Sequence, residues 1–439
     1  MNKKVLIVGN NAFVKQIHDI LIPLDIDISW ANTTSEVKES ISKIDIDFII
    51  IDADGYQDNG FDTDQDVLQL IVNSKKRFLF VSSKATKENI QSAAKLGCSD
   101  YILRSSNRRE FIAHFNSIIH DKTRITCIGG GTGLFTLLLG LKKISNVMLS
   151  SIVTMSDDGG SSGKLRDAMG ILPPGDIRRS LVALSNAPEV MNEIMQYRFN
   201  KASGLEEHSF GNLFLAALND ITGSMADAVK MLGDILNVQG VVLPVTSQIT
   251  KLSAEFEDET IIRGESNIDL VNGRDESLHI KKLWHEPEAE CGLDVYASLV
   301  NSDIITIGPG DLFTSIVANL TIKGLSEAIV TSRAKKVYVC NLMTKPGETW
   351  DYSAVDHIRE IVQYLGKDCL DTVIISNSAL TEQSTKEYVK KNQKPVAFGD
   401  LEEIHKITKA EIVLADIGNQ TDLVRHDSQK LKTQIEKLL

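Results

Sequence analysis

The chain has 439 residues, which is too long for one ordinary hydrophobic core and predicts two or three domains of about 150 residues each. Its 47 basic and 59 acidic side chains give a formal net charge of -12, and no long run of Lys or Arg is present, so we exclude nucleic acid and anionic membranes as partners. The five cysteines form no CxxC pair, and no apolar stretch resembles a signal peptide or approaches the roughly 18 residues of a membrane span, so we expect a cytoplasmic protein with reduced thiols.

Short apolar runs rich in β-branched residues recur in the N-terminal part, with helical patterns between them. Alternation of this kind predicts βαβ units around a parallel sheet. The runs cover residues 5–8, 26–30, 47–51, 78–81 and 101–103. The sequence therefore predicts an N-terminal α/β domain built on a five-stranded sheet.

This pattern, together with the segment Leu-Gly-Cys-Ser-Asp-Tyr-Ile-Leu at residues 96–103, resembles a response-regulator receiver domain over residues 1–121. The resemblance implies a flavodoxin-like fold. It also places Asp52, at the end of the third predicted strand, where that family has its phosphoacceptor, and Ser82 at the family's hydroxyl position.

The residues expected around Asp52 depart from that family. Receiver domains hold Mg²⁺ with an acidic pair after the first strand, because a hard divalent ion needs carboxylate oxygens beside the incoming phosphoryl group. Gly9 and Asn10 stand in those places here, and Arg104 replaces the family's Lys. We therefore expect a degenerate receiver-like domain that is not phosphorylated at Asp52 and serves for packing, protein docking or homodimerisation.

A second series of apolar runs follows the polar residues 120–123, where we place the domain boundary. It predicts a second parallel sheet in residues 124–439, with residues 239–280 as a strand-rich excursion from it. The runs cover residues 125–128, 151–155, 304–307, 336–340, 372–376 and 411–414.

The first run of this series leads into a Gly-rich loop at residues 129–133 and then into a helical pattern. Glycines let the backbone approach a phosphate without Cβ clashes, and the free amides and dipole of a helix N-terminus favour an anion. Leu134 stands where the third Gly of a GxGxxG fingerprint belongs, which weakens a standard dinucleotide fold. The alternative is a turn that serves only close packing of strand and helix.

The second run ends in an acidic, Gly-rich loop at residues 156–163 that contains Asp157 and Asp158. A carboxylate at this place can accept hydrogen bonds from ribose hydroxyls, and a pair of carboxylates can hold Mg²⁺. Either role would put this loop beside the first one. The alternative is a solvated acidic turn without a ligand.

Further polar stretches with Gly, at residues 173–178, 208–212 and 308–315, mix backbone amides, hydroxyls and Arg as phosphate and sugar recognition requires. With the two Gly-rich loops and residues 337–349 and 425–427, they closely resemble the gluconeogenesis factor family (YvcK-like), relatives of 2-phospho-L-lactate transferase (CofD-like). The likeness covers nearly all of residues 124–439 and implies a Rossmann-like parallel-sheet module of the transferase type.

The resemblance implies a cytoplasmic regulatory protein that binds UDP-sugars such as UDP-N-acetylglucosamine and is required for growth on gluconeogenic carbon sources, cell shape and cell wall synthesis. One departure is Trp350, where the family more often has a small or acidic residue. The family's loops place the ligand at Gly130, Gly131, Thr132, Gly133, Asp157, Asp158, Ser161, Ser162, Asn212, Gly308 and Gly310.

Two functions from different classes remain open at this point. One is a sensor that binds the ligand without turning it over, since the motif residues His208 and His426 have no catalytic partner visible in the sequence. The other is a transferase in which Asp157 and Asp158 hold Mg²⁺, the only cofactor suggested, on a nucleotide diphosphate substrate. An NAD-type binder and a pure interaction protein are weaker alternatives.

Overall fold

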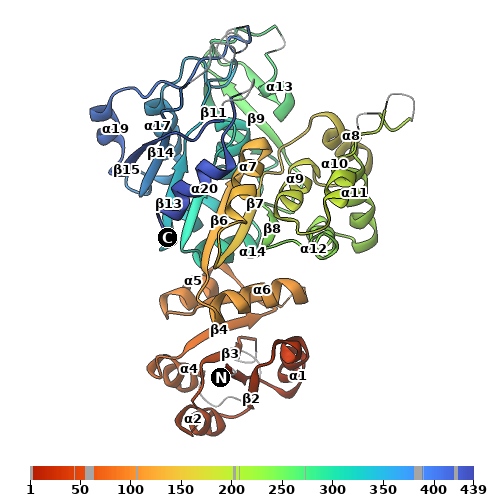
Figure 1. Cartoon of the computed structure of the whole chain (residues 1–439), viewed down its shortest axis with the longest axis vertical. Helices are drawn as coiled ribbons and strands as arrows, with labels where there is room; N and C mark the ends of the chain where they lie inside the picture. The colour runs from red at the N-terminus through yellow and green to blue at the C-terminus, as the bar shows by residue number, and fades with distance from the viewer. Residues whose placement is uncertain are drawn as a thin grey trace.

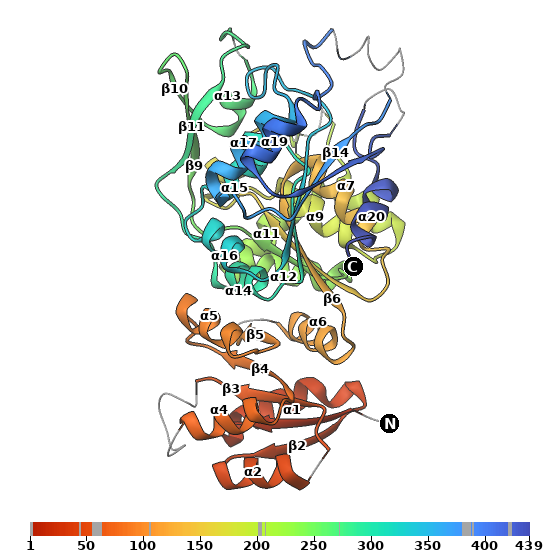
Figure 2. The same cartoon turned by 90° about the vertical axis from the view of Figure 1, so that its left-hand side faces the viewer.

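The computed structural model describes residues 3–43, 45–54, 64–104, 107–200, 204–206, 208–271, 273–379, 388, 390–419 and 424–439. Figures 1 and 2 show a smaller N-terminal domain stacked against one end of a larger C-terminal domain. Among the described helices, none is both long and apolar enough to cross a membrane.

The N-terminal domain has a five-stranded parallel sheet in the order β2-β1-β3-β4-β5, the order of flavodoxin-like folds. Its strands are β1 (Lys4–Val8), β2 (Asp27–Ala31), β3 (Phe48–Asp52), β4 (Arg77–Ser82) and β5 (Asp100–Leu103). Its helices are α1 (Asn11–Leu21), η1 (Ile22–Leu24), α2 (Thr34–Lys43), α4 (Asp64–Asn73), α5 (Lys87–Lys95) and α6 (Arg108–Ile119). The predicted flavodoxin-like class is confirmed.

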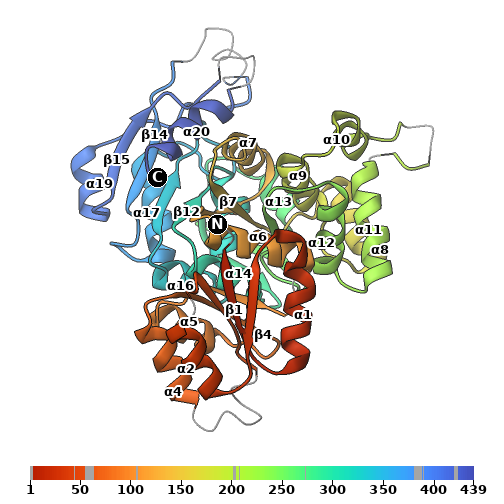
Figure 3. The same cartoon turned by 60° about the horizontal axis from the view of Figure 1, so that its bottom comes forward.

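Alternating residues of each strand supply two cores on opposite faces of this sheet. Val5 and Ile7 pack with residues of α1 and α6 on one face, whereas Leu6 and Val8 pack on the other with residues of α2, α4 and α5. Figure 3, viewed from the N-terminal end, shows α1 apart from α2 and α4 on the two sides of the strands. Burial on both faces explains why these strands read as continuous apolar runs.

The C-terminal domain is built on a seven-stranded sheet in the order β15-β14-β13-β12-β6-β7-β8, with parallel pairing throughout. The strands are β6 (Thr123–Gly129), β7 (Val147–Val153), β8 (Val241–Pro244), β12 (Ile304–Ile307), β13 (Lys335–Val339), β14 (Thr372–Ser376) and β15 (Glu411–Ala415). This confirms the predicted Rossmann-like parallel sheet.

Helices fill the connections of the C-terminal domain. They are α7 (Gly131–Leu141), α8 (Gly160–Met169), α9 (Gly175–Leu184), α10 (Glu189–Gln196), α11 (Phe210–Thr222), α12 (Met225–Ile235), α14 (Leu293–Val300), η2 (Leu312–Val317), α15 (Ala318–Leu320), α16 (Leu325–Thr331), α17 (Ala354–Leu365), α19 (Leu401–Ile407) and α20 (Ser428–Glu436).

The observed excursion begins and ends later in the chain than the predicted range 239–280. Residues 241–244 form β8, which pairs with β7 as an edge of the main sheet, so the excursion begins only afterwards. It consists of an antiparallel sheet of β10 (Ile261–Arg263), β9 (Lys251–Phe256) and β11 (Ile280–Glu286), with α13 (Glu265–Asp269) beside it. A short apolar run such as residues 241–244 can form a strand of the main sheet or of the antiparallel sheet, and only the strand with which it pairs shows which sheet it joins.

The order of the main sheet creates a crevice. Strand β6 lies between β7 and β12, so the chain direction across the sheet reverses at β6 and β12. At such a switch point the connections after the two strands run to opposite faces of the sheet, and ligands of open α/β sheets bind at the carboxyl ends of the strands there. The loops concerned are the Gly-rich loop after β6 and residues 308–311 after β12.

The domains meet at the opposite, amino edge of the main sheet. Asn301 Nδ2, after α14, donates a hydrogen bond to Asp100 Oδ1 of β5 at 2.9 Å, and Arg109 Nε of α6 donates to Asp234 Oδ1 of α12 at 2.6 Å. The chain's own C-terminal domain therefore covers this face of the N-terminal domain, and homodimerisation through its remaining surface stays a prediction.

Candidate functional site

The Gly-rich loop needs glycine at specific positions. Gly131, the first residue of α7, has a φ of +60°, which side-chain-bearing residues rarely adopt. A Cβ on Gly133 would lie 2.4 Å from the carbonyl oxygen of Pro309, in the loop after β12. The two loops on either side of the switch point therefore touch because Gly133 has no side chain.

An acidic residue that the sequence analysis did not assign to the site also contacts this loop. Asp176, in the first turn of α9, accepts a hydrogen bond from the amide of Gly131 at 2.8 Å and pairs with Arg179 at 3.2 Å. Burial raises the pKa of the Asp176 carboxyl, and the charge of Arg179 opposes that rise. A bound phosphate must therefore use the next amides of α7, because Asp176 already occupies that of Gly131.

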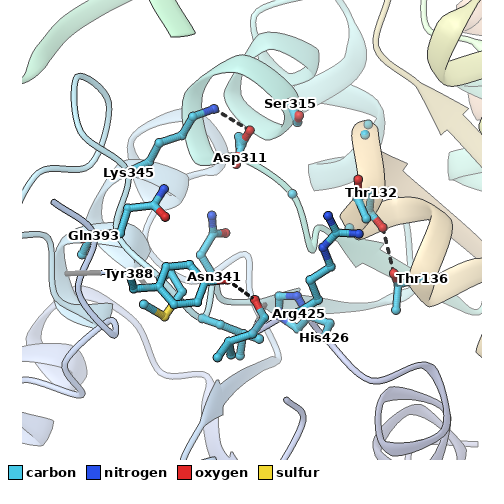
Figure 4. A pocket seen from close by; sticks show the side chains of 18 residues that line it. Thr132, Thr136, Asp311, Ser315, Asn341, Lys345, Tyr388, Gln393, Arg425 and His426 are labelled. Carbon is cyan, nitrogen blue, oxygen red and sulfur yellow. Dashed lines mark hydrogen bonds and ion pairs between the residues drawn. The ribbon is translucent and has the colours of Figure 1, made fainter. Parts of the chain in front are cut away.

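A cavity of about 380 Å³ opens beside the Gly-rich loop, at the carboxyl ends of β6, β12 and β13 (Figure 4). Its size lies within the usual range for small-ligand sites. It is lined by Gly130, Gly131, Thr132, Gly133, Thr136, Gly310, Asp311, Ser315, Asn341, Leu342, Met343, Thr344, Lys345, Tyr388, Gln393, Val424, Arg425 and His426.

Polar groups from several loops reach this cavity. Figure 4 shows Lys345 and Arg425 entering it from different segments, with Asn341 between them in this view. Asn341 Oδ1 is buried and has no hydrogen-bond partner among the described residues, so it can accept a hydrogen bond from a ligand. Tyr388 donates its hydroxyl to the carbonyl of Val424 at 2.8 Å, which fixes the orientation of its ring.

His426 has a structural hydrogen bond at the edge of the cavity. Its Nε2 lies 3.2 Å from the carbonyl oxygen of Cys340, and burial lowers the pKa of the ring to about 4. The imidazole is therefore neutral at physiological pH and donates its Nε2 hydrogen to Cys340.

Lys345 joins three acidic side chains at one wall of the cavity. Its Nζ lies 2.7 Å from Asp311 Oδ2 and 2.9 Å from Glu348 Oε1, and it also contacts Asp269 of α13. These carboxylates form the one described group of three whose oxygens lie close enough together to hold a metal ion. Since the lysine ammonium already binds all three, this cluster carries its own cation. The sequence analysis named neither the lysine nor its partners as site residues.

The acidic loop after β7 belongs to a second cluster of polar residues, which lies next to Asp176. Asp157 accepts a hydrogen bond from the amide of Gly159 at 3.0 Å, and its charge contributes to the raised pKa of Asp176. Asp158 accepts a hydrogen bond from the amide of Ser266 at 2.7 Å and faces Arg166 at 3.8 Å. Asp158 thus ties the excursion to α8, while Asp157 remains near the Gly-rich loop.

Ser161 is held in a chain of hydrogen bonds. Arg178 Nε donates to Asn212 Oδ1 at 2.9 Å, which turns the amide of Asn212 so that its Nδ2 donates to Ser161 Oγ at 3.0 Å. The Ser161 hydroxyl can then donate to Nδ1 of His208, 3.0 Å away. His208, which has no visible partner in the sequence, thus has one in the fold.

The predicted site residues consequently fall into two groups. Gly130, Gly131, Thr132, Gly133 and Gly310 line the cavity. Six predicted residues do not line the cavity: Asp157, Asp158, Ser161, Ser162, Asn212 and Gly308. The first five belong to the neighbouring cluster of polar residues. Gly308 follows the end of β12 and has a φ of +76°. Their contact with a ligand stays a prediction.

Comparison with known proteins gives the family of this chain. Residues 125–417 match the sequence model of the family described as 2-phospho-L-lactate transferase CofD. The gluconeogenesis factor of Bacillus subtilis is 40% identical over 321 residues, which cover 73% of this chain and 99% of the relative. A putative gluconeogenesis factor of Aquifex aeolicus is 42% identical over 325 residues, covering 72% of this chain and 97% of the relative. The chain belongs to the CofD family, among its gluconeogenesis factors.

Structural comparison agrees with this family. The crystal structure of a UPF0052 family member from Bacillus halodurans matches with a TM-score of 0.68 and 37% identity, over 72% of this chain and 99% of that one. The family's sequence model begins inside β6, at residue 125, so the N-terminal domain lies outside the matched residues. The receiver-like fold of that domain follows from its strand order.

Proposed function

We propose that this protein binds a UDP-sugar in the cavity beside the Gly-rich loop and acts as a cytoplasmic regulatory protein in growth on gluconeogenic carbon sources, with a link to cell shape and cell wall synthesis. The observation that carries the proposal is the position of the N-terminus of α7 at one end of a cavity into which Arg425 and Asn341 also reach. The names of the relatives, gluconeogenesis factors, support the physiological part.

The cavity suits the chemistry of a sugar nucleotide. The amides of Thr132 and Gly133 at the start of α7 favour phosphate oxygens, and Arg425 supplies a planar donor for the same diphosphate. The buried Oδ1 of Asn341 can accept the N3 hydrogen of uracil, and the fixed ring of Tyr388 offers an apolar face. The diphosphate and the base of a UDP-sugar therefore each meet a suitable group in the cavity.

Binding without turnover is favoured because the described residues that line the cavity include no activated nucleophile, and the hydrogen-bonded pair of Ser161 and His208 lies outside that lining. The hydroxyl of Tyr388 is engaged with Val424, and His426 donates to Cys340. Covalent catalysis needs a nucleophile next to an available base. A regulatory role therefore fits these side chains better than acyl or glycosyl transfer through an enzyme intermediate.

Titration calorimetry with UDP-N-acetylglucosamine tests the site. Gly131→Val should abolish binding, because a side chain strains a residue at positive φ and crowds the approach of the phosphate. Arg425→Ala should cost about 1.5 to 3 kcal/mol of binding free energy, the value of a hydrogen bond to a charged group. Arg359→Ala, in an exposed pair with Asp356 on α17, is the matched control and should bind like the wild type. Equal affinity of all four proteins would reject the proposed site.

A second candidate is a Mg²⁺-dependent transferase of phosphorus-containing groups, which the family's description and the proximity of Asp157 to Asp176 favour. Mg²⁺ needs one or two well-placed carboxylates besides phosphate oxygens. Asp157→Asn should then abolish metal-dependent consumption of a nucleotide diphosphate substrate. Asp158→Asn should keep it, because Asp158 already binds Ser266 and Arg166. If no nucleotide diphosphate is consumed with Mg²⁺, only the binding role remains.

A further inference from the structure

The carboxyl edge of the N-terminal sheet gathers a set of hydrogen-bond donors around Asp54. Ser82 Oγ, at the end of β4, donates to Asp54 Oδ1 at 2.5 Å, and Ser83 Oγ donates to Oδ2 at 2.5 Å. The amide of Ser83 lies 2.8 Å from Oδ2, and that of Lys84 lies 3.3 Å from Oδ1. One carboxylate thus receives two hydroxyl and two amide donors from a single turn.

Arg104, which follows β5, completes this set. Its guanidinium lies 3.5 Å from Asp54 Oδ2, contacts Asp52 and stacks over the ring of Phe13 at 5.0 Å. The Asp54 side chain is only 13% exposed. Although burial alone would raise the pKa of Asp54, its hydrogen bonds with Ser82 and Ser83 hold that pKa below the usual value.

Two amides, two hydroxyls and a guanidinium are the donors that bind a tetrahedral oxyanion such as phosphate. Asp54 lies two residues beyond the end of β3. Its carboxylate competes with free anions for these donors at a high effective concentration, because the chain tethers it beside them. The donors are arranged for an anion, and the protein supplies that anion itself.

We infer that the carboxyl edge of the N-terminal sheet is an oxyanion-binding site which Asp54 occupies permanently, so that the domain stays in a single state and keeps its β5 side docked on the C-terminal domain. This inference does not depend on the ligand of the C-terminal cavity.

A short path joins the occupied site to the domain contact. Strand β4 pairs with β5, and Ser82, one of the residues that bind Asp54, lies opposite Leu103 of β5 and accepts a hydrogen bond at its carbonyl from the amide of Arg104 at 2.7 Å. Asp100, at the other end of β5, accepts the hydrogen bond of Asn301 from the C-terminal domain. Anchoring Ser82 through Asp54 therefore restrains the strand that carries the contact.

Hydrogen–deuterium exchange of the full-length protein with and without inorganic phosphate tests the inference. The variants are made in the Gly131→Val background, so that any phosphate bound at the Gly-rich loop is reduced equally in all of them. In Asp54→Ala, the amides of Ser83 and Lys84 should exchange at least about tenfold faster than in the parent, the change for about 1.4 kcal/mol of lost protection. Phosphate should restore their protection in Asp54→Ala and leave the parent unchanged. Peptides that contain Asp100 and Asn301 should follow the same pattern with a smaller amplitude.

Two further variants keep the result interpretable. Asp45→Ala changes an Asp that is 91% exposed in the same domain and should behave like the parent with and without phosphate. Asp54→Asn keeps the shape of the side chain and removes its charge, so it should show the same phosphate-dependent protection if Asp54→Ala does not fold. If phosphate protects residues 83 and 84 equally in the parent, or in neither Asp54 variant, the inference is wrong.

Discussion

At the scale of single residues, the donors and acceptors around Asp52 explain why we expect no phosphorylation of this side chain. Asp52 is buried beside Arg104, its Oδ2 has no hydrogen-bond partner among the described residues, and burial raises the pKa of its carboxyl. Asn10, in place of an acid, caps α1 by accepting a hydrogen bond from the amide of Phe13 at 2.9 Å. The residue that would help bind Mg²⁺ in a receiver has become part of a helix cap.

Asp52 should therefore not be phosphorylated by small phosphodonors. With one available carboxylate oxygen and no acidic pair, Mg²⁺ has too few ligands to stabilise the transferring phosphoryl group. Intact mass spectrometry after incubation with acetyl phosphate and Mg²⁺ should show no added phosphoryl group, while an active receiver domain treated in parallel is modified. A stoichiometric mass increase that disappears in Asp52→Ala would contradict this expectation.

At the scale of secondary-structure elements, Lys345 links three segments that are distant in the sequence. Asp269 ends α13 of the excursion, Asp311 precedes η2, and Glu348 accepts a hydrogen bond from the hydroxyl of Thr314 in η2 at 3.1 Å. Burial raises the pKa of Glu348 to about 7, and the charge of Lys345 counteracts that rise. The ammonium group of Lys345 thus links the excursion to the wall of the cavity.

Lys345→Met should destabilise the protein and make its stability depend on divalent cations. Of the three carboxylates only Glu348 is buried, and removing one partner of a buried ion pair typically costs about 3 to 5 kcal/mol. Since the three carboxylates are close enough to share an ion, Ca²⁺ or Mg²⁺ should restore part of the loss. Urea unfolding with and without Ca²⁺ measures both effects.

The matched control is Lys394→Met, which removes a lysine that is 58% exposed and paired with Asp351. Its stability should change by less than about 1 kcal/mol and should not respond to the cation. If Lys345→Met and Lys394→Met behaved alike, Lys345 would not be the link that its contacts suggest.

At the scale of the whole molecule, a buried ion pair lies where the two domains join. His114 Nδ1 of α6 is 2.7 Å from Asp100 Oδ2, the same carboxylate that binds Asn301, and Arg124 of β6 lies 3.8 Å from it. Burial alone would lower the pKa of His114, but the charge and hydrogen bond of Asp100 outweigh burial and raise it. Both domains therefore depend on one carboxylate at their boundary.

This pair should make stability depend on pH. A histidine with a raised pKa in the folded state contributes its full stabilisation below its unfolded pKa of 6.5, and this contribution disappears as the pH rises through the raised value. The pKa of Asp100 is lowered, so its own contribution falls only in acid, outside this window. The free energy of unfolding of the wild type should therefore fall as the pH rises above 6.5 and through the raised pKa of His114.

His114→Gln should lack this decrease, whereas His405→Gln, on the surface of α19, should retain it. Urea unfolding of the three proteins across the pH range measures the difference. A decrease of the same size in His114→Gln as in the wild type would show that other groups cause it.

The sequence by itself determined the class of both domains, because buried parallel strands require continuous apolar runs and a phosphate-type loop requires glycine at fixed places. It also determined the family, since the polar loops at residues 129–133, 156–163 and 308–315 occur in the family's order. The predicted loss of Mg²⁺ ligands at Gly9 and Asn10 needed only the identities of the two residues.

Only the tertiary structure decided which polar residues share a site. Asp176, Lys345 and Arg425 come from separate segments that the family resemblance had grouped together, but the sequence does not show which side chains of these segments border the cavity or the Gly-rich loop. The tertiary structure likewise separated Asp158, which binds the excursion, from Asp157, although the two are neighbours in the sequence. The physical reason is that periodicity and loop composition are local properties, whereas a hydrogen bond to a distant amide or carboxylate exists only after the strands between them have packed.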